Sequence, residues 1–194
     1  MDFTEIAGRV EERLDLVLSP ARAAHSRGVA GLAAELCRRH GLEASRGRLA
    51  GLAHDMCKEM PKRELRFLAA EYPGIVAGSA LLADKILHGP AAAVLLRRDY
   101  GVDDPELLEA VALHTVGKPG MSGLCLFVYC ADKLEPGRGH VDPAFLERCI
   151  GLPPSEMLLM VVADTIDWLA MRGHDIAPET RLLYDSLVNV VPAP

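Results

Sequence analysis

The chain has 194 residues, of which half are apolar and a quarter are charged, and its formal net charge is −6. This composition supports a hydrophobic core of ordinary domain size and excludes an intrinsically disordered chain. An acidic chain without a long basic run is also a poor candidate for binding duplex nucleic acid through its phosphates. We therefore expect a folded, soluble protein that has no nucleic-acid partner.

The cysteines and the apolar runs point to the cytoplasm. The five cysteines show no CxxC spacing, which indicates reduced thiols in a cytosolic protein. The charged N-terminal segment lacks the apolar run of a secretory signal. The longest apolar run, residues 123–131, is too short to span a bilayer. We expect a cytoplasmic protein without membrane association.

The chain is expected to fold into helices. Aromatic residues make up only 5% of the chain, which favours aliphatic helix packing over a sheet. Ser19, Asp104 and Asp142 each precede a proline, the pairing that starts helices, and glycines stand at several expected helix ends. Apolar residues recur at steps of three and four between these marks. The sequence predicts helices near residues 3–17, 20–40, 43–58, 61–71, 90–100, 105–116, 122–134, 143–150, 155–172 and 179–189.

One segment could be read as a strand. Residues 123–131 have the composition of a buried strand, but Ser122 is a good helix cap. Cys125, Val128 and Asp132 also follow at helical spacing. We therefore predict a helix here and an all-α fold.

Several histidines and acids are expected to point inward. His25 lies on the apolar face of its helix, and His114 lies on that of another. His54 and Asp55 follow the small residues 49–53, which would let a second helix approach closely. Asp132 continues the apolar face of its own helix. A carboxylate in that position is costly unless it is paired or coordinates a cation.

Each of these residues alone has an ordinary explanation. A single histidine on an apolar face is usually a hydrogen-bonded core residue, and Asp132 could pair with Lys133 or with a distant arginine. Taken together, however, inward-facing ligand types on several helices favour one bound metal. Imidazole and carboxylate groups suit Fe, Mn, Co, Ni or Zn, whereas calcium prefers oxygen ligands alone. Such a metal activates water and polarises a phosphoryl group.

Three cations stand close in sequence to these ligands. Arg22 precedes His25 by one helical turn, Lys58 follows Asp55 by one turn, and Arg138 follows Asp132 closely. Solvated surface charges are the default for such residues. Their spacing from the expected metal ligands makes them candidates for contacts with phosphate.

The segments that carry these residues resemble a known superfamily. The chain resembles the HD phosphohydrolases, whose signature is H…HD…D on a helical bundle. It is more closely similar to the bacterial YqeK-type family of symmetrical dinucleoside tetraphosphate hydrolases. The specific parts are H-x-x-G-x-P-G-M and A-D-x-x-E-P-G-R. The resemblance is carried by residues 22–29, 51–59, 87–90, 114–121, 131–138 and, less sharply, 173–180.

The resemblance implies an all-α HD-domain helical bundle that forms a single domain over residues 1–194. Its core would span about residues 18–140, and the C-terminal helices in 141–194 would complete the nucleotide pocket. The implied reaction is hydrolysis of diadenosine tetraphosphate to two ADP with a divalent metal, for which iron is expected. The oligomeric state stays open, with a homodimer among the expectations.

The resemblance also implies roles for individual residues. The metal ligands would be His25, His54, Asp55 and Asp132. The catalytic residues would be Asp55, His88 and His114, with the two histidines as phosphate partners and proton donors to the leaving group. The nucleotide contacts would be Arg22, Asp55, Met56, Cys57, Lys58, His88, His114, Thr115, Tyr129, Arg138, Ile176 and Thr180.

Three alternatives stay open at this point. The chain could have another HD-type activity, such as a nucleoside monophosphate phosphatase, a cyclic-nucleotide phosphodiesterase or a guanosine tetraphosphate hydrolase. It could instead be a nucleotide-binding sensor with little turnover. Within the site, His88 and His114 could hold a second metal.

Overall fold

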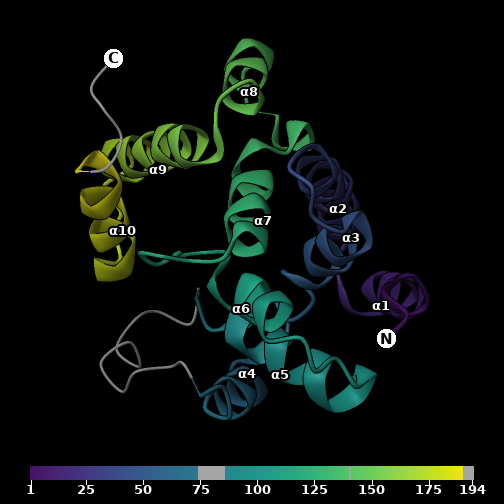
Figure 1. The fold of residues 1–194 in the computed structure, drawn as a ribbon. Coiled ribbons are helices and arrows are strands. Elements are labelled where there is room, and N and C mark those ends of the chain that lie inside the picture. Colours follow the sequence, from purple (N-terminus) through teal and green to yellow (C-terminus); the bar gives the residue numbers. More distant parts are fainter. Residues whose placement is uncertain (74–85, 140, 190–194) are drawn as a thin grey trace.

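The computed structural model describes residues 1–73, 86–139 and 141–189. Within these ranges the chain forms helices and no strand, which confirms the all-α prediction (Figure 1). The helices are α1 (Phe3–Val17), α2 (Pro20–Arg39), α3 (Ala44–Ala53), α4 (Lys62–Ala69), α5 (His88–Tyr100), α6 (Pro105–Leu113), α7 (Gly123–Leu134), α8 (Pro143–Ile150), α9 (Pro154–Met171) and α10 (Pro178–Val188), with a short 3-10 turn at Pro136–Arg138.

Helix α7 is the centre of the arrangement. Figure 1 shows α2 and α3 on one side of α7, and α9 followed by α10 on the other. Helix α7 packs against α2, α3, α6 and α9, while α4 and α5 pack against each other below α6 in this view. The uncertain strand-like segment is therefore a central helix, and Ser122 caps it by accepting a hydrogen bond from the backbone N–H of Cys125.

Small residues bring the helices on both sides of the site into close contact. A Cβ on Gly51 of α3 would lie 2.5 Å from Ala30 Cα on α2. A Cβ on Gly89 of α5 would lie 2.6 Å from the carbonyl oxygen of Ala112 on α6. The expected close approach of a second helix to the small residues before His54 is thus confirmed.

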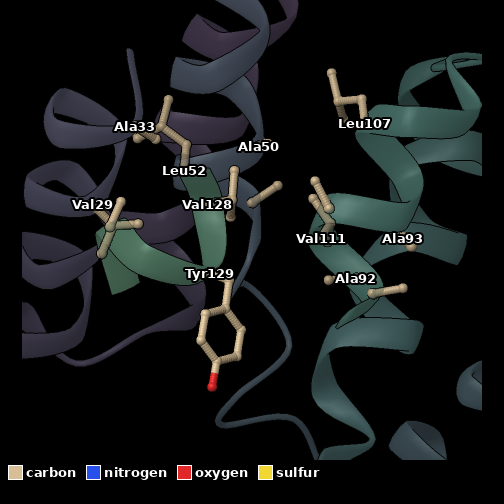
Figure 2. Close-up of a cluster of buried hydrophobic side chains, with 14 of the residues drawn as sticks. Val29, Ala33, Ala50, Leu52, Ala92, Ala93, Leu107, Val111, Val128 and Tyr129 are labelled. Atoms are coloured by element: carbon tan, nitrogen blue, oxygen red, sulfur yellow. The ribbon is translucent and has the colours of Figure 1, made fainter. Parts of the chain in front are cut away.

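The core between these helices is aliphatic. Figure 2 shows Val29 and Leu52 from the α2–α3 side near Val128 of α7, with Leu107 and Val111 of α6 opposite. Tyr129 lies at one edge of this cluster, and its hydroxyl points away from the aliphatic side chains. The ends of the helices that surround this rigid core carry the polar residues of the site.

Two predicted boundaries are wrong in an informative way. The helix expected over 43–58 ends at Ala53, and a turn follows it through residue 59. His54 is the C-cap of α3, so His54 and Asp55 stand at a helix end. The helix expected over 105–116 ends at Leu113, which likewise leaves His114 at a helix end.

The predicted starts at Asp104 and Asp142 are confirmed, because both carboxylates accept backbone hydrogen bonds at the caps. Ser19 stands before α2 as expected, but its hydroxyl donates to Glu59 and does not cap the helix. All five cysteines are buried free thiols. Among the residues that the structure describes, no helix has the length and apolar character needed to cross a membrane.

Candidate active site

Four of the predicted ligands converge where α2, the end of α3 and α7 meet. His25 comes from α2, His54 and Asp55 follow α3, and Asp132 comes from α7. His25 Nε2 lies 3.1 Å and His54 Nε2 lies 3.5 Å from Asp132 Oδ1. The ligand atoms of His25, His54 and Asp55 all lie within 4.8 Å of one another, a grouping able to hold a metal ion.

The hydrogen bonds behind the two histidines orient them as metal ligands. His25 Nδ1 donates to Glu135 Oε2 at 2.9 Å, and His54 Nδ1 donates to the carbonyl oxygen of Gly51 at 2.7 Å. A neutral imidazole that donates from Nδ1 carries its lone pair on Nε2, which is how metal-bound histidines are commonly held. His54 Nε2 is buried and has no hydrogen-bond partner in the part of the chain that the structure describes. These donors fit a bound divalent metal.

Glu135, for which the sequence predicted no role, fixes His25. Its side chain is only 7% exposed, and its second oxygen accepts the backbone N–H of Gly137 at 2.6 Å. A Cβ on Gly28 of α2 would lie 2.5 Å from Glu135 Oε1. The carboxylate can therefore reach His25 only because residue 28 has no side chain.

A second group of polar residues shares Asp55 with the first. His88 begins α5, and His88 Nε2 lies 2.9 Å from both Asp55 Oδ1 and His114 Nε2. His114 Nδ1 donates to the carbonyl oxygen of Val111 at 2.7 Å, so its lone pair also lies on Nε2. Asp55, His88 and His114 form a second set that could hold a metal. The alternative of a second metal therefore keeps its geometric basis.

Burial and neighbouring charges set the protonation of these groups. Burial lowers the pKa of His114 to about 3, and burial also lowers the pKa of His88. Burial acts to raise the pKa of Asp55, but His54 and the other imidazoles lower it well below its ordinary range. His88 and His114 are therefore neutral at neutral pH, and Asp55 is ionised.

His54 behaves differently from the other two buried histidines. Burial lowers its pKa, but the negative charges of Asp55 and Asp132 outweigh burial and raise it. Burial also acts to raise the pKa of Asp132, and Lys133 together with His25 lowers it well below the usual range. The two carboxylates thus attract a cation to the place that His54 Nε2 faces.

The predicted phosphate-binding cations surround this cluster. Lys58 Nζ lies 3.3 Å from Asp55 Oδ1 and 3.0 Å from His88 Nε2. Arg138 donates to both the side chain and the backbone carbonyl of Asp132. Arg22 lies farther out, 3.9 Å from Asp55 Oδ2, and its Nε donates to Glu59. Lys58 and Arg138 are therefore built into the site, and Arg22 stands at its edge.

An open pocket of about 250 Å³ lies between the cluster and α9. Two of the cations predicted to bind phosphate, Lys58 and Arg138, line it together with His114 and Thr115. The hydroxyl oxygen of Thr115 lies 3.1 Å from His114 Nε2. The full lining is Lys58, His114, Thr115, Asp132, Lys133, Arg138, Asp164, Thr165, Trp168 and Leu169.

The remaining predicted nucleotide contacts lie outside this lining. Met56 and Cys57 are buried in the hydrophobic core, and burial raises the pKa of the Cys57 thiol to about 12. Tyr129 is fully buried in α7. Thr180 is buried and donates to the carbonyl oxygen of Val116 at 2.9 Å, and Ile176 is half-buried. For these residues, contact with a nucleotide stays a prediction.

Two kinds of residue at the site were not predicted from the sequence. Glu135 stands one turn after Asp132 inside the A-D-x-x-E-P-G-R segment, so its spacing could have indicated a partner for a metal ligand. The pocket residues of α9, Asp164 to Leu169, carry no motif and come close only through the packing of α9 on α7. Lys133 was considered only as an ion-pair partner, yet it also lines the pocket.

The HD domain family matches residues 22–137 of this chain, a range that contains all four predicted metal ligands. The chain therefore belongs to the HD domain family, the class to which its helical fold and its histidine–aspartate cluster correspond. Known relatives narrow the class. The chain is 30% identical to the symmetrical bis(5'-nucleosyl)-tetraphosphatase of Bacillus subtilis, over 89% of this chain and 92% of that protein.

Two further comparisons match most of the chain. The protein of the same name from Halalkalibacterium halodurans is 28% identical over 88% of this chain and 91% of its own length. A crystal structure from Clostridium acetobutylicum, described as a predicted HD superfamily hydrolase involved in NAD metabolism, superposes with a TM-score of 0.85. It is 27% identical, and the match covers 94% of this chain and 96% of the other. The chain is a metal-dependent phosphohydrolase.

Proposed function

We propose that the chain hydrolyses diadenosine tetraphosphate symmetrically and releases two ADP. The observation that carries the proposal is one pocket in which Asp132, which contacts His25 and His54, lies beside the cations Lys58 and Arg138. Relatives named symmetrical bis(5'-nucleosyl)-tetraphosphatases support the substrate.

Each part of the site has a proposed role in this reaction. His25, His54, Asp55 and Asp132 would hold a divalent metal, which supplies an activated water and polarises a phosphoryl oxygen. Iron is the metal we propose, and Mn, Co, Ni or Zn would suit the same nitrogen and oxygen donors. The Nε2 lone pair of His114 makes it a hydrogen-bond acceptor, which disfavours the role of proton donor that the resemblance implied.

The cations explain the point of cleavage. Lys58 contacts Asp55, Arg138 contacts Asp132, and both line the pocket, so each would bind one of two successive phosphates of one nucleotide half. If two phosphates are held there, the bond presented for hydrolysis is the central one of a tetraphosphate. One ADP then leaves, and a second ADP remains between the cations.

The proposal is tested with a panel of nucleotides and with metal-stripped and reconstituted protein. We expect diadenosine tetraphosphate to be the fastest substrate, and its hydrolysis to be lost with the metal and regained on reconstitution. Faster release of phosphate from a mononucleotide, or faster cleavage of guanosine tetraphosphate or a cyclic nucleotide, would favour another HD-type activity. Tight binding without turnover would favour a sensor. A cytoplasmic location and a homodimer are further predictions.

A further inference from the structure

Helix α9 forms one side of the pocket. It contributes Asp164, Thr165, Trp168 and Leu169 to the lining, which also contains the predicted metal ligand Asp132 and the cations of the other side. Neither the sequence motifs nor the family match assigns a role to α9, and the matched range ends at residue 137. The kind of ligand group that α9 suits therefore follows from the side chains that it contributes to the pocket.

The two sides of the pocket differ in character. The first side is charged and suits phosphate, with Lys58, Lys133 and Arg138 among its residues. On the second side, Trp168 and Leu169 are the apolar members of the lining. A nucleoside diphosphate has the same two parts, namely charged phosphates and a flat aromatic base. The charged side of the pocket would take the phosphates, and Trp168 and Leu169 on the other side would take the base.

Trp168 contacts two residues that follow α9. The guanidinium of Arg172 lies 4.4 Å from the centroid of the indole ring, and the ring centroid of His174 lies 6.2 Å away. A cation over an aromatic face and a neighbouring ring restrict the indole. Aromatic residues are scarce in this chain, and Trp168 is its single tryptophan. The only indole of the protein thus lines the pocket and contacts Arg172 and His174.

The size of the pocket limits what it encloses. A volume of about 250 Å³ is below the roughly 300–1,000 Å³ of sites that surround a whole drug-sized ligand. A dinucleoside tetraphosphate is larger than such a ligand, so the pocket can take up part of one half and leaves the other half outside.

We propose that Trp168 stacks on the nucleobase of the enclosed half, and that Leu169 packs beside it. This inference rests on the proposed function, since it assumes a nucleotide substrate. It moves the base contact from Ile176 and Thr180 to α9. Stacking of a base on an aromatic side chain changes affinity by roughly ten- to a hundredfold.

The fluorescence of Trp168 tests the contact without a mutation. Because no other tryptophan contributes, ADP binding to the metal-loaded protein should quench the emission as the base stacks. Inorganic tripolyphosphate has no base and should bind without that quenching. Calorimetry run in parallel measures occupancy. ADP binding without a change in emission, or equal quenching by tripolyphosphate, would overturn the proposal.

Variants separate this inference from the proposed function. Trp168→Leu should raise the KM for diadenosine tetraphosphate about ten- to a hundredfold and leave tripolyphosphate affinity unchanged, while Trp168→Phe should keep most of the affinity. Met171→Ala, an exposed position at the end of the same helix, is the control. If Trp168→Leu keeps the wild-type KM, this inference alone fails. If the wild-type protein neither binds ADP nor cleaves the tetraphosphate, the proposed function fails with it.

Discussion

Glu135 Oε2 lies 2.9 Å from His25 Nδ1, and this contact fixes which nitrogen of His25 faces the other metal ligands. Carboxylates that hold a metal-bound histidine in this way typically contribute about ten- to a hundredfold in metal affinity. Glu135→Gln should therefore weaken metal binding by about that factor and leave the fold intact. Metal titration and thermal unfolding check both parts. Glu147→Gln, which removes an exposed carboxylate on α8, is the control, and equal metal affinity in the two variants would contradict the role of Glu135.

A pair of glycines in α2 tests the same contact from the other side. Gly28→Ala would place a Cβ within 2.5–2.8 Å of the Glu135 carboxylate and so displace it from His25. Gly31→Ala adds a Cβ that meets nothing within 4 Å. We expect Gly28→Ala to lower metal affinity. Gly31→Ala should keep that affinity and raise stability by about 0.5–1 kcal/mol, because alanine favours a helix interior. Equal metal affinity in both would show that Glu135 has room to adjust.

Removal of a central ligand should abolish metal binding and turnover together. His54→Ala deletes the buried Nε2, which has no hydrogen-bond partner among the described residues, and Asp55→Ala deletes the carboxylate shared by both groups of ligands. Elemental analysis alongside kinetics measures the two losses in one preparation. An active Asp55→Ala protein with a full equivalent of metal would remove Asp55 from the metal centre.

Metal affinity should depend on pH through His54. Asp55 and Asp132 raise the pKa of His54 against the effect of burial, so in the metal-free protein a proton competes with the metal for Nε2. Affinity should rise with pH until the raised pKa is passed and then level off. The same shift stabilises the metal-free fold at low pH, and that contribution is lost as pH rises through the folded-state pKa. Calorimetric titrations across pH check the sign, and affinity that falls with increasing pH would contradict it.

The cations should affect nucleotide binding and spare the metal. Loss of a charge-assisted contact to phosphate costs about 1.5–3 kcal/mol, or roughly ten- to a hundredfold. Lys58→Ala and Arg138→Ala should therefore raise KM or lower kcat by such factors. Arg22→Ala should have a smaller effect, because Arg22 is held by Glu59 at the edge of the site. Arg38→Ala, on the exposed surface of α2, is the control. Wild-type kinetics in Lys58→Ala and Arg138→Ala would make both residues surface charges.

The helices could be predicted because their determinants are local. Cap residues such as Asp104 and Asp142, the period of apolar positions and the small residues before His54 all act within one or two turns. The end of α3 at Ala53 could not be predicted this way. Helical spacing continues beyond it, and what ends the helix is the tertiary arrangement around Asp55.

The site was partly predictable for the same reason. His25, His54, Asp55 and Asp132 stand out because polar ligands on apolar faces are costly without a partner. Trp168 shows no such signal, since an aromatic residue on an apolar helix is ordinary core. Its position in the pocket depends on how α9 packs on α7, which no local pattern contains.

The products formed from diadenosine tetraphosphate test the central claim most directly. Metal-reconstituted protein is incubated with the substrate, and the nucleotides are separated by chromatography over a time course. Two ADP molecules for each tetraphosphate consumed, with no AMP or ATP at early times, is the expected result, because we propose that Lys58 and Arg138 together hold two phosphates of one half. AMP and ATP in equal amounts would contradict it.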